Sequence, residues 1–243
     1  MAIAIVPVAV SVHTIVSFDF SMAPVPMWHS TIFGPYFVAG AIFSGIAALI
    51  LAMAVLRKVL HLEEYLHPVH FQNLGKLLLM MSLLWGYFMF AERLTVWYGN
   101  EPSEMAVFWS TQTGAYAPLF WTMVFCNFVI PFPLLAIRRL RTITGTVVAS
   151  STVIVGMWLE RFLIIVPSLA NKNLPYSWGF YRPQPVEIVI TIATFAAMAF
   201  LYTLFAKTVP IISIWELKVG AHRRPVLTSQ EEEEVEGLWR TRP

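Results

Sequence analysis

The stretch TGTVVASSTVIVGMWLERFLIIVP, residues 144–167, contains two charged side chains, Glu160 and Arg161, in an otherwise uncharged run. About 20 residues are enough to cross the roughly 30 Å hydrocarbon core of a bilayer as an α-helix. A charged side chain at the centre of such a span costs at least about 2.5–3.5 kcal/mol on insertion scales, so it normally faces protein or water and serves a function. The stretch therefore predicts a membrane-spanning helix and marks Glu160 and Arg161 as candidate site residues.

The rest of the chain is also unusually apolar. Of its 243 residues, 58% are hydrophobic and 12% are charged, whereas soluble domains carry roughly a quarter charged residues. Because Met1 is followed by neither a basic region nor a cleavage site, we expect the first apolar segment to stay in the membrane. We expect an all-α fold, a polytopic transmembrane helical bundle over residues 1–215, followed by a charged tail over residues 216–243. Its six expected spans are residues 2–20, 33–56, 77–97, 117–137, 144–167 and 186–210.

The basic residues indicate the orientation of these spans. They gather in the connections after the second and fourth spans and in the tail, whereas the other loops are poor in them, with Lys172 and Arg182 in the last. Positively charged connections stay on the cytoplasmic side of a membrane, so we expect both termini to be cytoplasmic. The basic residues concerned are Arg57, Lys58, Lys76, Arg138, Arg139, Arg141, Lys218, Arg223 and Arg224.

Six ionisable residues lie within the expected spans, and with this orientation all of them fall in the outer half of the membrane. Neighbouring residues on a helix point about 100° apart, so we do not expect Glu160 to pair with Arg161. We expect pairs between spans instead, with Glu92 bound to Arg161 or Asp19 bound to Arg93. The six residues are His13, Asp19, Glu92, Arg93, Glu160 and Arg161.

Two interpretations of these charges stay open. In the first, they form structural salt bridges that fix helix packing. In the second, they are protonatable groups on a route from the middle of the membrane to its outer face. His13 titrates most readily near neutral pH, and Ser17 lies one turn away on the same face, where its hydroxyl would extend a hydrogen-bonded chain.

Cofactor ligands are scarce. The single Cys126 excludes an iron–sulfur cluster held by this chain alone. A di-haem centre is excluded as well, because His13 is the only histidine well inside a span. The histidines at 61, 67 and 70, with acidic residues at 63 and 64, match no standard ligand spacing, so we interpret that stretch as a solvated loop at the membrane interface. We predict that this chain binds no haem and no metal.

The two long outer loops, residues 97–118 and 168–185, are rich in Trp, Tyr and Pro. Aromatic residues at this depth are typical of the belt that lies among lipid headgroups. Because the loops are long for simple connections, they also fit a docking surface for a subunit outside the cytoplasm. The sequence leaves both interpretations open.

Several long motifs resemble the NrfD/polysulfide reductase membrane-subunit family. They are SVHTIVSFDF (residues 11–20), VPMWHSTIFGPYFVAGAIFSG (25–45), GMWLERFLIIVPSL (156–169) and LPYSWGFYRP (174–183). The most similar branch is the quinol-oxidising membrane subunit of alternative complex III. The resemblance places the family's proposed proton route and polar core at His13, Asp19, Arg93, Glu160 and Arg161, with Glu92 assigned from its local context.

The resemblance implies a bacterial inner-membrane subunit without its own cofactor, which exchanges electrons between quinone and an iron–sulfur protein on the outer face. Relatives have about ten spans in two bundles, and this chain corresponds to the second. We therefore expect another membrane chain to supply the missing bundle, other respiratory-complex subunits as further partners, and no catalysis by this chain alone. We expect no nucleic acid among the partners. A transporter or channel half, or a structural assembly subunit, remains the alternative.

Overall fold

The computed structural model of the chain describes residues 2–24, 28–63, 65–170, 179 and 181–208. The chain divides into two compact units, Met1–Tyr181 and Arg182–Pro243. Within the described residues all regular secondary structure is helical. The expected charged tail, residue 64 and residues 171–178, with Lys172, lie outside the described residues.

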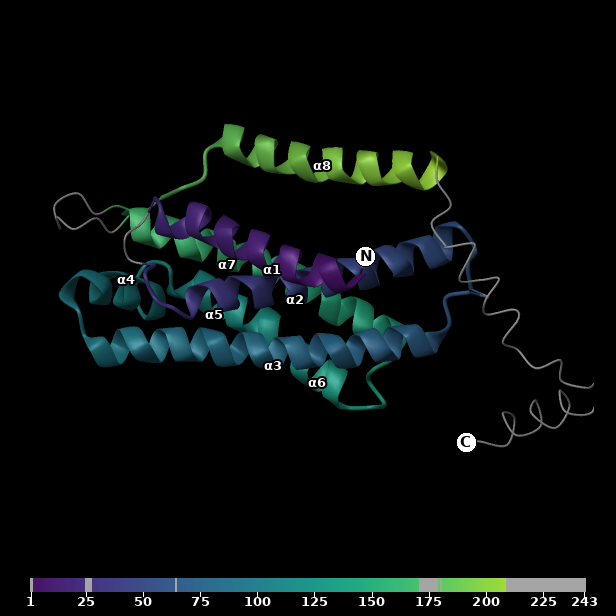
Figure 1. Cartoon of the computed structure of the whole chain (residues 1–243), viewed down its shortest axis with the longest axis horizontal. Coiled ribbons are helices and arrows are strands. Elements are labelled where there is room, and N and C mark those ends of the chain that lie inside the picture. The colour runs from purple at the N-terminus through teal and green to yellow at the C-terminus, as the bar shows by residue number, and fades with distance from the viewer. Residues whose placement is uncertain (1, 25–27, 64, 171–178, 180, 209–243) are drawn as a thin grey trace, which may run out of the picture. The chain divides into compact units, whose positions relative to one another are not determined.

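In the part of the first unit that the structure describes there are seven α-helices and two π-helical turns, which are coloured from purple to green in Figure 1. They are α1 (Ala2–Ser17), η1 (Phe18–Met22), α2 (Phe33–Val59), α3 (Pro68–Gly99), α4 (Pro102–Gln112), α5 (Ala117–Val124), η2 (Phe125–Val129), α6 (Pro131–Ala136) and α7 (Ile143–Ala170). The second unit contains α8 (Pro185–Thr208). Six helical segments of the described residues are long and apolar enough to cross a membrane, which confirms the predicted all-α fold with six membrane-spanning segments.

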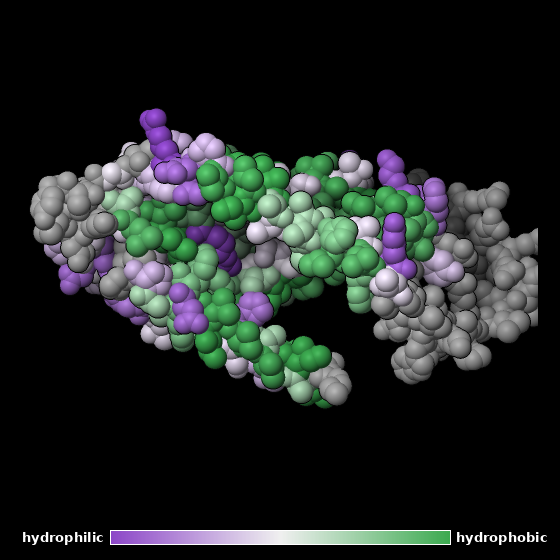
Figure 2. Space-filling view, turned by 90° about the horizontal axis from the view of Figure 1, so that it is seen from above, coloured by the Kyte–Doolittle hydropathy of each residue, from purple (hydrophilic) through white to green (hydrophobic). Residues whose placement is uncertain are grey.

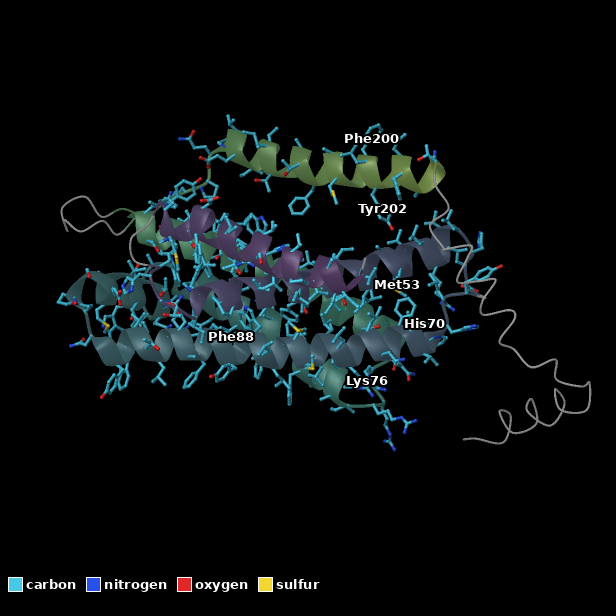
Figure 3. The ribbon with its side chains drawn as sticks, viewed as in Figure 1. Met53, His70, Lys76, Phe88, Phe200 and Tyr202 are labelled. Atoms are coloured by element: carbon cyan, nitrogen blue, oxygen red, sulfur yellow. The ribbon has the colours of Figure 1, made fainter. Side chains whose placement is uncertain are left out.

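The third span begins earlier than predicted. Pro68 occupies the first turn of α3, after His67 in an extended conformation, which suits proline because its fixed φ fits a helix start and it lacks an N–H to satisfy. The helix is about 48 Å long at 1.5 Å per residue, longer than the hydrocarbon core. The stretch that we interpreted as an interfacial loop therefore becomes helical from Pro68, and Figure 3 labels His70 and Lys76 on this first part of α3.

The fourth span is interrupted. Ile130 donates its N–H to the carbonyl of Phe125, five residues back, so η2 forms a π-turn immediately before α6. Pro131 then occupies the start of α6 and cannot donate the hydrogen bond that a continuous helix would need. The interruption buries Asn127 completely. A proline next to a π-turn is a known cause of helix kinks.

The loop between the third and fourth spans is partly helical. It contains α4, which begins at Pro102 and packs against α3, α5 and α7. Asn100 ends α3 in a left-handed conformation (φ 48°) and donates to the carbonyl of Val96, which turns the chain towards α4. This loop is therefore an ordered part of the bundle.

The helices of the first unit share one apolar core, in which α2 contacts α1, α3 and α7. Gly40 allows a close approach of α2 to α7, because a Cβ there would lie 2.9 Å from the Met157 Cε atom. Apolar residues cover much of the surface visible in Figure 2, as expected for helices that meet lipid or other membrane subunits. The largest fully buried apolar side chains are Trp85, Tyr116, Phe33, Phe43, Phe71, Ile50 and Leu78.

Candidate functional site

Glu160 on α7 is the most deeply buried acidic side chain of the described residues, with 2% of its surface exposed. Its Oε1 atom accepts a hydrogen bond from the Tyr36 hydroxyl on α2 and another, 2.5 Å long, from the Trp85 Nε1 atom on α3. The carboxylate thus joins three helices. A carboxylate in this setting needs such donors, because an unpaired buried charge is strongly destabilising.

Arg161 pairs with Glu160, contrary to the expectation that sequence neighbours would not meet. The Arg161 Nη1 atom lies 3.4 Å from the Glu160 Oε2 atom, close enough for an ion pair, although no hydrogen bond links the two. The guanidinium also lies 3.9 Å from the centroid of the Phe37 ring, a cation–π contact. Because Gly40 has no side chain, the Arg161 head group has room to fold back along α7.

Glu92 and Arg93, which are adjacent on α3, bind neutral partners. Glu92 is 5% exposed and accepts a hydrogen bond of 2.5 Å from the Ser30 hydroxyl. The Arg93 Nη1 atom donates to the Thr111 hydroxyl on α4 at 3.1 Å, and its guanidinium lies 5.1 Å from the centroid of the Phe120 ring on α5. These contacts tie α3 to the segment before α2 and to α4 and α5.

The predicted pairs between spans are absent from the ion pairs of the described residues, which are His29–Glu104, Arg57–Glu63 and Glu160–Arg161. Hydroxyl, indole and aromatic partners replace them. Both arginines are engaged elsewhere. Arg161 folds back towards Glu160 and the Phe37 ring. Arg93 reaches Thr111 on α4 and the Phe120 ring on α5.

A small cavity brings three of the charged residues together. Glu92, Arg93 and Glu160 line it together with Trp28 and Tyr36. Its volume is about 10 Å³, room for about one water molecule. We call Glu92, Arg93, Glu160 and Arg161 the polar cluster.

The segment before α2 contributes Trp28 to the wall of the cavity. The Trp28 Nε1 atom donates to the carbonyl of Ile164 on α7 at 2.8 Å, which holds this segment against the bundle. Next to it, the His29 Nε2 atom lies 2.5 Å from the Glu104 Oε1 atom on α4, with His29 largely exposed. Polar groups therefore run from the exposed His29 to Ser30 and then to the buried Glu92.

Sequence reasoning missed the partners Tyr36, Trp85, Ser30, Thr111 and Glu104. Aromatic and hydroxyl residues are common in membrane spans, so the first four of these residues do not stand out as a rare charge does. Glu104 is charged, but it lies outside the expected spans, where an acidic residue is ordinary. One signal was available for two of them, because Ser30 and Tyr36 lie in the quoted motif at residues 25–45.

His13, Ser17 and Asp19 lie apart from the described contacts of the polar cluster. His13 is exposed on α1, and its Nδ1 atom contacts the carbonyl of Ala9 at 2.7 Å. Ser17 is buried and donates to the carbonyl of Thr14 at 2.6 Å. Asp19 is exposed on η1. Their part in a proton route stays a prediction.

Metal ligands do not gather in the described part of the chain, where no three His, Cys, Asp or Glu residues are close enough to hold a metal ion. The His67 and His70 rings stack with centroids 6.2 Å apart. Cys126 is a free, partly exposed thiol on η2.

Comparison with known proteins gives one family. The family model described as "Polysulphide reductase, NrfD" matches residues 1–172, which include α1 to α7 and every residue of the polar cluster. No curated protein matches the chain.

Proposed function

Because the chain belongs to the polysulphide reductase NrfD family of membrane subunits of quinol-linked oxidoreductases, we propose that it supports electron exchange between quinol and an iron–sulfur partner. Subunits of this family typically pair with iron–sulfur subunits. In this proposal the iron–sulfur protein binds on the outer face. A second membrane chain completes the quinone-reactive bundle, in an arrangement like that of alternative complex III in a bacterial inner membrane.

The observation that carries the proposal is the buried, hydrogen-bonded carboxylate of Glu160 beside Arg161. Oxidation of a quinol to a quinone releases two electrons and two protons. The electrons pass to the iron–sulfur partner, and the protons need acceptors within the membrane. A carboxylate that is buried near a water-sized cavity is suited to accept and release a proton.

We propose that the proton route runs from Glu160 across the cavity to Glu92. From there it continues through the Ser30 hydroxyl towards the exposed His29 and Glu104. Tyr36 holds Glu160 in place at the start of this route. The two donors, Tyr36 and Trp85, hold the Glu160 side chain towards the cavity in both its protonated and its ionised form.

α4 supports an outer docking surface for the partner. Trp109 is an exposed residue of this helix, and the exposed Glu101 is its N-cap residue. Semi-rigid surfaces lose less conformational entropy on binding. The aromatic-belt interpretation of the same loop predicts contact with lipid headgroups instead, and subunit cross-linking at α4 distinguishes the two.

The experiment that tests the proposal compares wild type with Glu160→Gln in the natively purified complex. We expect co-purification of an iron–sulfur subunit with its characteristic spectrum in both proteins. Glu160→Gln keeps the shape of the side chain but removes its titration. We therefore expect normal assembly and a loss of quinol turnover of about 10²-fold or more, as for other positioned proton acceptors. Normal assembly with unchanged turnover would refute the proton role of Glu160.

A transporter or channel half is the second candidate, because the fourth span is interrupted at η2 and α6. Broken spans with buried polar residues line the substrate sites of many transporters, and Asn127 lies in this break with both side-chain amide atoms lacking a hydrogen bond within the described residues. This candidate predicts ion flux in proteoliposomes that Asn127→Leu abolishes. The oxidoreductase proposal predicts no such flux without quinol.

A further inference from the structure

A second and larger pocket lies between α3, α4 and α5. Its volume is about 320 Å³, within the range of small-molecule sites. Apart from Arg93 and Gln112, its lining residues are apolar, with Phe120 and Trp121 among them. We call it the α3–α5 pocket.

Arg93 connects this pocket to the polar cluster. It lines both the α3–α5 pocket and the small cavity that contains Glu92 and Glu160. A guanidinium has five N–H donors. Within the described residues its one hydrogen bond runs from Nη1 to Thr111, so further donors remain for a ligand oxygen.

The walls of the pocket are aromatic and fixed in position. The Trp121 Nε1 atom donates to the backbone carbonyl of Gln112 at 3.2 Å, and the Trp121 and Phe120 rings meet edge to face at 5.4 Å. The Phe120 ring in turn lies against the Arg93 guanidinium. Aromatic side chains arranged in this way can bind a flat ring, because offset and edge-to-face contacts between aromatic rings are energetically favourable.

The mouth of the pocket opens at the apolar surface of the bundle. Trp97 and Leu94 line it on α3 and are 54% and 46% exposed, and Trp121 on α5 is 49% exposed. Apolar side chains this exposed on a membrane span meet lipid or another membrane chain, so a ligand reaches the pocket from within the membrane plane. Because a lipid phosphate needs several donors and this pocket has a single charged side chain, the walls favour a neutral ring with carbonyl oxygens.

We propose that the α3–α5 pocket binds the head group of a membrane quinone or quinol, with one ring oxygen accepting a hydrogen bond from Arg93. This inference rests on the proposed function, which supplies the substrate class. It adds a site within this chain, next to the proton acceptors of the polar cluster. A quinol held there has its hydroxyl beside the cavity that leads to Glu160.

Photolabelling of the native complex tests the site. The probes are short-tailed azido analogues of a benzoquinone and of a naphthoquinone, and peptide mapping locates the label. We expect label on α3 and α5 around Leu94 and Trp121. Excess unlabelled quinone should compete with it, whereas phosphatidylglycerol should not. Competition by the phospholipid alone would overturn the inference and assign the pocket to a lipid.

Two variants of α3 sharpen the test. Leu94→Trp fills the mouth of the pocket and should weaken labelling by about tenfold or more, because the ring no longer fits. Leu83→Trp is the control, since Leu83 lies about three turns away on nearly the same face and is 45% exposed, like Leu94. Val124→Phe fills the pocket from α5 and should repeat the loss if Leu94→Trp impairs assembly. Equal labelling of all three variants would refute the site.

Quinol oxidation, measured in the same samples, separates this inference from the proposed function. A complex that oxidises quinol without labelling at the α3–α5 pocket would refute the pocket inference and leave the proposed function standing. A complex that neither oxidises quinol nor takes up the label would refute both.

Discussion

Tyr36 and Trp85 are the residues that make a carboxylate tolerable inside this bundle, because both donate to the same oxygen of Glu160. Removal of one donor leaves part of the desolvation penalty of the buried charge uncompensated. We therefore expect Tyr36→Phe, which keeps the ring and deletes the hydroxyl, to lower the free energy of unfolding by about 1–3 kcal/mol. Thermal unfolding of the detergent-solubilised complex measures the change.

Tyr87→Phe is the matched control for this prediction. Tyr87 lies on α3 with 61% of its surface exposed, so deletion of its hydroxyl removes no buried contact. We expect the Tyr87→Phe variant to have the same free energy of unfolding as wild type. Equal stability of the Tyr36→Phe and Tyr87→Phe variants would mean that the Tyr36 hydroxyl contributes nothing net to holding Glu160.

The charged residues of the site could be predicted from the sequence, but their hydrogen-bond partners could not. Glu160 was predictable because a carboxylate in an apolar span is rare and costly. Its donor Trp85 was not, since the contact depends on how α3 and α7 rotate against each other. Arg161 shows the same limit: its fold-back towards Glu160 depends on the space that Gly40 leaves on another helix.

Among the helices, the contact of α7 with η2 depends on a residue without a side chain. A Cβ atom at Gly156 would overlap the Asn127 side chain and lie 2.9 Å from the Cys126 Cβ atom. Gly156→Ala therefore forces α7 away from the interrupted fourth span. We expect a loss of about 1–3 kcal/mol in the free energy of unfolding, as for other overpacked sites, measured by thermal unfolding.

Gly45→Ala on α2 is the corresponding control, because a Cβ at Gly45 meets nothing within 4 Å. Alanine is the better helix former, so this variant should be unchanged or more stable by up to about 1 kcal/mol. If both alanine variants behaved alike, close packing of α7 on η2 would not be what Gly156 provides.

Helix existence was predictable and helix limits were less so. Hydrophobic runs of sufficient length identified each of the six candidate spans found in the described residues. We did not predict the start of α3 at Pro68 or the separate helix α4, because both stretches are rich in polar and amphipathic residues. Their helicity depends on a proline in the first turn and on packing against neighbouring helices. An apolar composition predicts which segments cross the membrane, but it does not predict helices that extend beyond the membrane.

For the whole molecule, the orientation in the membrane decides whether the proposed proton route would end outside or inside. The excess of basic residues near Arg139 predicts that this connection is cytoplasmic and that Glu101, at the start of α4, lies outside. In a Cys126→Ser background, a membrane-impermeant thiol reagent added to intact cells should label Glu101→Cys and not Arg139→Cys. Permeabilised cells, in which both cysteines should react, provide the control. Labelling of Arg139→Cys alone would reverse the topology, place His29 and Glu104 on the cytoplasmic side, and turn the proposed proton exit into an entry.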